Sequence, residues 1–168
     1  MSRAATPAIA ALVAAGVPHE VLTYPHDARA ESFGEEAVAA LADEHGLLPE
    51  QIFKTLVIAG PSGLGAPKLG IAVVPVPCKL SLKAAAAALG WPRATMAERS
   101  AAERSTGYVL GGISPLGQRK RLPTVVDASA LEFDRVLCSA GKRGSDLALA
   151  PDDLVRLTGA VTADIQAV

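Results

Sequence analysis

Apolar residues along the chain alternate between helical spacing and the spacing of strands. Between residues 6 and 16, Ile9, Leu12 and Val13 form one apolar stripe, and similar spacing predicts helices over 32–46, 81–90 and 151–158. A single helical turn is expected over 49–53 and a short helix after Ser100. Short apolar runs between glycines and prolines predict strands over 20–24, 54–59, 69–76, 108–110, 124–127, 135–139, 147–149 and 161–165.

Residues that cap helices support these boundaries. A hydroxyl or carboxylate before the first turn accepts a backbone N–H, and glycine readily ends a helix. The expected caps are Thr6 before Pro7, the capping-box pairs Ser32/Glu35 and Ser100/Glu103, and Ser81, with Gly16, Gly46 and Gly90 as stops.

The order of these elements indicates the fold class. Helices are interleaved with strands, and several strands are joined as hairpins, including a wide hairpin across the glycine- and proline-rich loop 60–67. This order predicts an α/β (α+β) fold with a mixed sheet. With 168 residues, no internal repeat and no long linker, the chain is expected to form one domain over 1–168.

Composition narrows the class of protein. Half of the residues are hydrophobic and a fifth are charged, which excludes a disordered chain. The two cysteines, Cys78 and Cys138, are far apart, which indicates reduced core thiols. No apolar run reaches the eighteen residues of a membrane span, so a cytoplasmic protein is expected. Net charge is −6 over 1–52 and +5 over 53–168, which permits one acidic and one basic side or ordinary solvated charge.

Several common motifs are absent or incomplete. The glycines at 60, 63 and 65 lead from strand to strand, unlike a dinucleotide-binding loop. Gly112 and Gly117 have P-loop spacing, but Gln118 stands where the phosphate-binding lysine should be, and the segment is one residue too long for a nucleophile elbow. The three histidines lack metal-ligand spacing, so neither a metal nor a cofactor is expected.

Three segments carry candidate chemistry. Lys54 begins an apolar strand, so its ammonium group lies either near the core or in water at the end of a snorkelling side chain. The segment 106–117 contains paired glycines that could direct N–H groups at a ligand or form a tight connection, and Arg119, Lys120 and Arg121 follow it. The turn 139–146 carries Lys142 and Arg143, which a bare hairpin would not need. The cations favour an anionic partner.

These segments resemble the YbaK family of aminoacyl-tRNA deacylases, and within it the Cys-tRNA(Pro)/Cys-tRNA(Cys) deacylases. The resemblance rests on FKTLV (53–57), on STGYVLGGISPLGQRKRLPTVVDASA (105–130) and on SAGKRGSDLALAPDDLVRLTGA (139–160). TYPHD (23–27) and SFGEEAV (32–38) fit the same pattern, so the likeness covers nearly the whole chain. The family is related to the editing domain of some prolyl-tRNA synthetases. The resemblance implies a barrel-like mixed sheet flanked by helices.

The resemblance also implies an activity and a set of site residues. The expected reaction is trans-editing: hydrolysis of the ester in mischarged Cys-tRNA(Pro), with prolyl-tRNA synthetase as a candidate partner. Lys54 is the first candidate for an essential residue, and Gly111 and Gly112 are expected to donate amides to the acyl oxygen. The expected substrate-binding residues are Tyr24, Ser114, Ser139 and Asp146, and the expected tRNA phosphate contacts are Arg119, Lys120, Arg121, Lys142 and Arg143.

The sequence permits more than one mechanism and more than one substrate. No side chain has the features of a nucleophile, and the resemblance implies that the substrate thiol attacks its own ester to give a thiolactone. A protein-activated water is the other route. The substrate could instead carry alanine or another small amino acid, or the chain could be a non-catalytic tRNA- or protein-binding module. On the favoured reading Cys78 and Cys138 are not catalytic.

Overall fold

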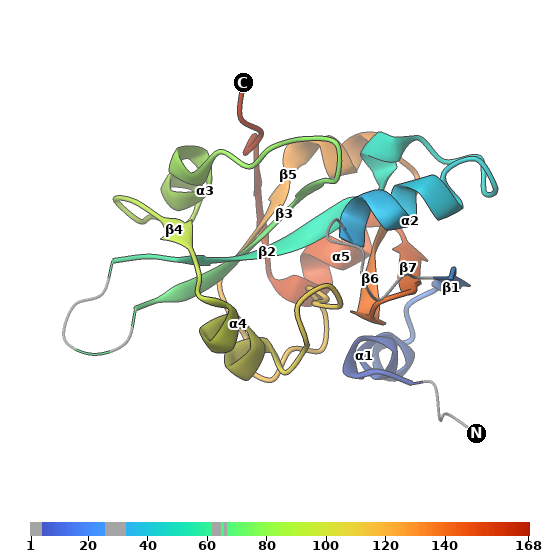
Figure 1. The fold of residues 1–168 in the computed structure, drawn as a ribbon, viewed down its shortest axis with the longest axis horizontal. Helices are drawn as coiled ribbons and strands as arrows, with labels where there is room; N and C mark the ends of the chain where they lie inside the picture. The colour runs from blue at the N-terminus through green and yellow to red at the C-terminus, as the bar shows by residue number, and fades with distance from the viewer. Residues whose placement is uncertain (1–4, 26–32, 62–64, 66) are drawn as a thin grey trace.

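The computed structural model describes residues 5–25, 33–61, 65 and 67–168 (Figure 1). Its helices are α1 (Pro7–Ala15), α2 (Phe33–Leu41), α3 (Leu82–Ala88), α4 (Arg99–Thr106) and α5 (Pro151–Thr158), with short 3-10 helices η1 (Pro49–Gln51) and η2 (Ala128–Glu132). Its strands are β1 (Glu20–Thr23), β2 (Phe53–Ala59), β3 (Leu69–Pro75), β4 (Thr95–Met96), β5 (Thr124–Asp127), β6 (Val136–Lys142), β7 (Ser145–Leu149) and β8 (Val161–Ala163).

The strands form two sheets, which confirms the mixed α+β class. One sheet has the order β4-β2-β3-β5-β8, in which β2 and β3 are antiparallel while β3, β5 and β8 run parallel. The other has the antiparallel order β1-β7-β6. A single bridge between Ile52 and Leu137 links the start of β2 to β6. The barrel-like expectation needs correction, because the two sheets meet along this one side and do not close into a barrel.

Alternation along the strands divides the interior into three apolar clusters. In β3, Ile71 and Val73 face a core shared with β6, β7, α1, α4 and α5, whereas Ala72 and Val74 face α3. A third cluster lies between α2 and the outer face of β6 and β7. In Figure 1, α3 and α4 flank the long β2–β3 hairpin, and α2 lies above β6 and β7. The start of β2 therefore lies where the three apolar clusters meet.

Most expected helix ends are present, with physical reasons for the exceptions. Thr6 and Ser81 accept the amides of Ile9 and Ala84, as expected of N-caps. The Ser100/Glu103 capping box is wrong: Glu98 is the N-cap of α4, without a side-chain cap hydrogen bond. Ser32 lies outside the described residues. The second helix ends at Leu41, and turns occupy residues 42–46.

The sequence interpretation missed one strand and placed another wrongly. Residues 108–110 are not a strand, because the chain turns there to bring Tyr108 inward, where its hydroxyl donates to the Leu116 carbonyl oxygen at 2.6 Å. The two-residue strand β4, which pairs with Ile58 and Ala59 of β2, was not expected. Among the described residues, no helix has the length and apolar character needed to cross a membrane.

Candidate active site

A cavity of about 250 Å³ opens beside the start of β2, where the two sheets meet. It brings together residues from α2, β2, β6 and β7, from the position directly after β1 and from the loop after α4. Five residues expected at the site line it: Tyr24, Lys54, Gly111, Ser139 and Asp146. The other lining residues are Ala37, Ile52, Phe53, Thr55, Leu56, Val76, Leu110 and Ile113. The cavity thus has mainly apolar walls and a few polar groups, as is typical of a small-molecule site.

Lys54 is the cation of this cavity. Its strand pairs with β3, and its Nζ donates to the Val76 carbonyl oxygen at 3.4 Å. Burial lowers the pKa of Lys54, and the neighbouring Cys78 and Glu35 act in the opposite direction. A partly dehydrated ammonium group binds an anion or a polarised oxygen more strongly than one in water, because fewer water contacts must be replaced. The structure therefore favours the near-core position over a snorkelling side chain.

Asp146 is a buried carboxyl group that lines the cavity from the other sheet. It lies on β7 directly across from Ser139 on β6, and only 5% of its surface is exposed. Burial raises the pKa of Asp146 to about 7. Within the described part of the chain, its carboxyl oxygens accept no hydrogen bond. This carboxyl group is available to a bound ligand, and its charge changes near neutral pH.

Tyr24 and Ser139 are held beside this carboxyl group. The backbone N–H of Tyr24 donates to the Gly144 carbonyl oxygen at 2.9 Å, which ties the end of β1 to the β6–β7 turn. Burial, with a smaller contribution from Asp146, raises the pKa of Tyr24 to about 12, so its phenol remains a hydrogen-bond donor. Ser139 Oγ accepts the N–H of Gly141 at 3.1 Å and keeps its own proton for donation.

The paired glycines form a turn at the cavity, but only one of their amides is available. Gly111 lines the cavity with φ +92°, a conformation that favours glycine. The N–H of Gly112 donates to the Val109 carbonyl oxygen at 2.9 Å, so the expected donation from Gly112 to substrate needs correction. Among the described residues, the amides of Gly111 and Ile113 have no hydrogen-bond acceptor. These two amides are therefore the candidates for binding an acyl oxygen.

Gly112 instead provides a close backbone contact. A Cβ built on it would lie 2.8 Å from Lys142 Cα and 3.2 Å from Arg143 N. The absence of a side chain thus lets the glycine turn pack directly on the β6–β7 turn. Two segments that the sequence singled out separately are neighbours in the fold.

Ser114 does not line the cavity, although substrate binding was expected of it. It is fully buried, and its Oγ accepts the N–H of Leu116 at 3.2 Å. Its carbonyl oxygen accepts the side-chain amide of Gln118 at 2.9 Å. Ser114 therefore stabilises the loop that carries Gly111.

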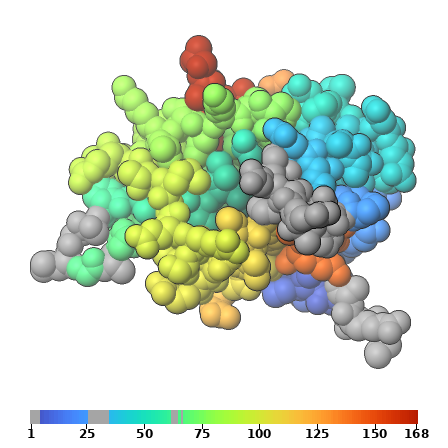
Figure 2. Space-filling view, viewed as in Figure 1, coloured from blue at the N-terminus to red at the C-terminus, as the bar shows by residue number. Residues whose placement is uncertain are grey.

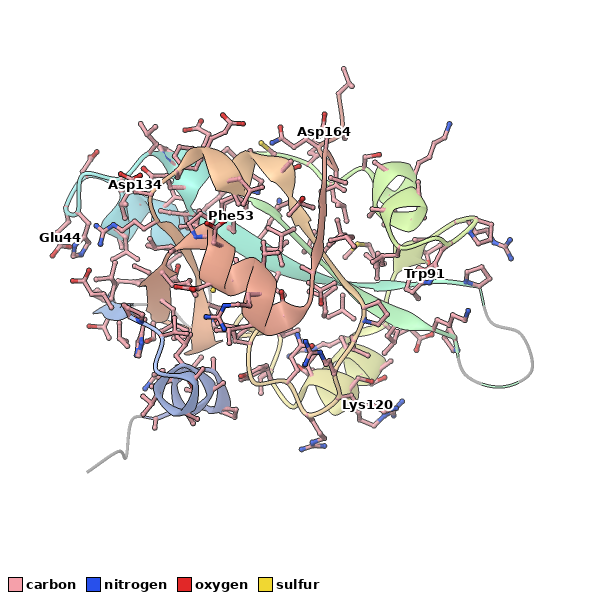
Figure 3. The ribbon with its side chains drawn as sticks, turned by 180° about the vertical axis from the view of Figure 1, so that it is seen from behind. Glu44, Phe53, Trp91, Lys120, Asp134 and Asp164 are labelled. Atoms are coloured by element: carbon pink, nitrogen blue, oxygen red, sulfur yellow. The ribbon has the colours of Figure 1, made fainter. Side chains whose placement is uncertain are left out.

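The expected phosphate-binding cations do not form one cluster. Arg119 follows α4, where its backbone N–H donates to the Thr106 carbonyl oxygen at 2.9 Å, and Arg121 lines a separate hollow beside α5. Figure 3 shows Lys120 near α4, well away from Phe53 at the start of β2. Arg143 pairs with Glu36 of α2 at 3.7 Å, with both side chains mostly buried. Lys142 alone is both exposed and directly beside the glycine turn.

Ala37, Thr55 and Ile113 are site residues that the sequence reasoning missed. Ala37 is 3% exposed and brings a small side chain from α2 to the cavity wall. Alternation along a strand would place Thr55 on the face opposite to Lys54, so the pattern gave no signal for it, and the contribution of α2 depends on tertiary packing. Cys138 is buried and Cys78 half-buried, and neither lines the cavity. The described residues contain no group of three or more His, Cys, Asp or Glu side chains arranged for a metal.

Asp146 should make the stability of the protein depend on pH. Its pKa is 3.8 in an exposed state and about 7 in the fold, so between these values the folded state binds more protons. Stability therefore falls as pH rises through this window. The free energy of unfolding of the wild type should fall by about 2–3 kcal/mol between pH 5 and pH 8 because of this group, and Asp146→Asn should abolish that fall. Urea unfolding of the wild type and the variant at several pH values measures both. An unchanged pH dependence in the variant would contradict the raised pKa.

Comparisons with known proteins show the family to which this chain is similar. Residues 34–157 match a family model described as an aminoacyl-tRNA editing domain. A protein of Enterococcus faecalis named as a candidate Cys-tRNA(Pro)/Cys-tRNA(Cys) deacylase, EbsC, is 37% identical over 128 residues, which cover 75% of this chain and 74% of that protein. The crystal structure of a candidate trans-editing enzyme for prolyl-tRNA synthetase is similar, with a TM-score of 0.81 and 27% identity over 100% of this chain and 99% of the other. A scaffold protein from epitope-grafting design is also similar, with a TM-score of 0.81 and 26% identity over 100% and 99% of the two chains.

Proposed function

The chain belongs to the aminoacyl-tRNA editing domain family, and we propose that it is an aminoacyl-tRNA deacylase whose substrate is Cys-tRNA(Pro). The observation that carries this proposal is the meeting of Lys54, the Gly111 amide and Asp146 in one small cavity with mainly apolar walls. An ammonium group and a main-chain donor suit an ester whose oxygens gain negative charge as the bond breaks. The likeness to EbsC and to the trans-editing enzyme supports the same reaction.

The need for such an activity follows from the physics of amino-acid selection. An apolar pocket discriminates between ligands that differ by one methylene by only about 1–3 kcal/mol. Proline and cysteine are both compact, so a synthetase that accepts proline also admits cysteine at some rate. A second hydrolytic site corrects this error. We therefore propose that the substrate is a product of prolyl-tRNA synthetase and that the protein acts in the cytoplasm, where the charged tRNA is used.

In the proposed binding mode, the cysteinyl group enters the cavity. The acyl oxygen lies by the amide of Gly111, and the ribose lies by Lys54 Nζ. The side chains of Ser139 and Asp146 face the α-ammonium group, which a carboxylate binds well when both are partly dehydrated. Because Lys54 and Asp146 lie on different walls, the cavity holds both ends of the amino-acid ester without pairing its own charges.

In the proposed chemical step, the substrate supplies the nucleophile. The thiolate sulfur attacks the acyl carbon, the bond from that carbon to the ribose oxygen breaks, and the ribose oxygen takes up a proton. The products are a cysteine thiolactone, which water then opens, and free tRNA. A thiol with a pKa near 8.5 is already partly ionised at neutral pH. Lys54 and the Gly111 amide stabilise the negative charge that passes from sulfur to the acyl and ribose oxygens.

A deacylation panel with the purified protein tests this function. Cys-, Ala-, Ser- and Pro-tRNA(Pro) should be compared at equal concentration, with release of the amino acid measured over time. We expect rapid hydrolysis of Cys-tRNA and slow hydrolysis of Ser-tRNA, because serine is similar in size but its hydroxyl is hardly ionised. Rapid hydrolysis of Ser-tRNA would instead indicate an activated water. Faster hydrolysis of Ala-tRNA than of Cys-tRNA would show that the substrate carries alanine instead of cysteine. If none of the four aminoacyl-tRNAs is hydrolysed, the protein is not a deacylase and the hypothesis of a binding module is favoured.

The size of the residue at position 37 should control which amino acid is accepted. Ala37→Val adds two methyl groups at the cavity wall and should lower kcat/KM for Cys-tRNA about tenfold, while affecting any activity on Ala-tRNA less. Ala39→Val on the exposed face of α2 is the matched control and should have no such effect. Thermal melting of both variants separates loss of fit from loss of folding. Equal rates for both variants would show that Ala37 does not limit the acyl group.

A further inference from the structure

Two consecutive apolar side chains in the loop after α4, Val109 and Leu110, are exposed, and the second of them borders the cavity. Val109 is 66% exposed and Leu110 is 40% exposed, and Leu110 also lines the cavity beside Gly111. In Figure 2, the yellow to gold atoms of α4 and of the segment after it lie at the surface that faces the viewer. Exposed apolar side chains that adjoin a cavity offer a surface for the apolar part of a ligand bound there.

Hydrogen bonds and packing hold this pair in place on both sides. The N–H of Leu110 donates to Glu103 Oε2 on α4 at 2.7 Å, and the Val109 carbonyl oxygen accepts the N–H of Gly112 at 2.9 Å. The preceding Tyr108 is buried, with its hydroxyl bonded to Leu116. The two side chains are thus presented to solvent by an anchored loop, and binding a ligand there requires little ordering of the backbone.

The size of the cavity determines which part of the substrate reaches this surface. At about 250 Å³ it is smaller than the clefts of ~300–1,000 Å³ that enclose drug-sized ligands, and an aminoacyl nucleoside is a ligand of that size. With the acyl linkage between Lys54 and Gly111, the cavity has room for the cysteinyl group and part of the ribose. The base of the terminal nucleotide must therefore lie outside, at the mouth.

We propose that Val109 and Leu110 form a platform for the purine base of the terminal nucleotide, and that Lys142 binds its 5′ phosphate. This inference rests on the proposed function and names the part of the substrate that binds outside the cavity. Lys142 is exposed and its backbone lies against the glycine turn at Gly112, so a cation and an apolar surface adjoin the same turn. The flat face of a purine is apolar and its phosphate is anionic, which matches both features.

Three substrates with the same acyl group test the platform. They are the cysteinyl ester of adenosine 5′-monophosphate, the cysteinyl ester of adenosine, and cysteine ethyl ester, which lacks both base and phosphate. Val109→Ser should lower kcat/KM for both nucleoside esters about fivefold, because part of an apolar contact is lost, and this loss should be absent with the ethyl ester. Lys142→Ala should lower kcat/KM only for the ester with the phosphate.

Matched variants give the controls. Val13 on α1 is also 66% exposed, so Val13→Ser should leave all three rates unchanged, and Val109→Ile should retain the preference for nucleoside esters.

If Val109→Ser affects all three esters equally, or none, the platform is wrong. A defect that appears only when prolyl-tRNA synthetase is added would assign Val109 to a protein contact and also overturn it. If the wild-type protein hydrolyses none of the three esters but binds the adenosine ester, the proposed reaction fails while the platform survives. If it neither hydrolyses nor binds that ester, both are wrong.

Discussion

Lys54→Ala should lower kcat/KM for Cys-tRNA deacylation by at least about a hundredfold while tRNA binding is largely retained. Lys54 lines the cavity and is partly buried, and burial lowers its pKa, so its ammonium group is partly dehydrated. Its interaction with the leaving ribose oxygen grows as the ester breaks, and loss of such an interaction reduces kcat more than it raises KM. Single-turnover deacylation at saturating protein measures the chemical step.

Three variants separate charge from packing at this position. Lys54→Met keeps most of the apolar stem and should be as inactive as Lys54→Ala, whereas Lys54→Arg retains the charge and should keep part of the activity. Lys79→Ala removes an exposed lysine that does not line the cavity and serves as the control for net charge. Full activity of Lys54→Met would show that the ammonium group has no part in catalysis. Loss of tRNA binding in parallel with turnover would favour the binding-module hypothesis.

Gly112→Ala should reduce deacylation about thirtyfold or more through a shift of the backbone. The added Cβ would lie 2.8 Å from Lys142 Cα and 3.1 Å from its carbonyl carbon, and backbone atoms cannot rotate away as a flexible side chain can. The glycine turn must therefore move off the β6–β7 turn, which carries the Gly111 amide away from the acyl oxygen. Misplacement of a reacting group by about 1 Å is enough to cause losses of this size.

A second glycine separates this effect from a general cost of adding a methyl group. Gly46 has φ +65° and nothing within 4 Å of its Cβ position, so Gly46→Ala costs stability without touching the cavity. It should melt at a lower temperature than the wild type and retain its rate of deacylation at 25 °C. If Gly112→Ala is active as well, the position of the turn does not control the reaction.

Local signals in the sequence were sufficient for most of the elements and for part of the site. The hydroxyl caps, the glycine stops and the short apolar runs each depend on neighbouring residues, and they placed α1, α3, β2 and β3 within a residue or two. The strand expected over 108–110 failed because its apolar pattern reflects a buried Tyr108 followed by exposed Val109 and Leu110.

Tertiary packing determined the rest of the site. Residues 119–121 follow the glycine turn closely in sequence, yet the chain carries them back toward α4 and α5, away from the cavity. Arg143 was expected to meet phosphate, but α2 brings Glu36 to it. The N–H of Gly112 is occupied because it donates to the Val109 carbonyl oxygen. Residue types alone do not reveal this hydrogen bond. Contacts between segments distant in sequence cannot be deduced from local spacing.

The central claim is that Lys54 Nζ and the Gly111 amide act on one acyl linkage. A crystal structure with an unreactive analogue, in which an amide joins cysteine to the 3′ carbon of adenosine, tests this most directly. The account predicts that the acyl oxygen lies within hydrogen-bond distance of the Gly111 N–H, with the ribose beside Lys54 Nζ and the cysteinyl side chain near Ala37. An analogue bound with its acyl group outside the cavity, or with Lys54 and Gly111 contacting different parts of the ligand, would contradict it.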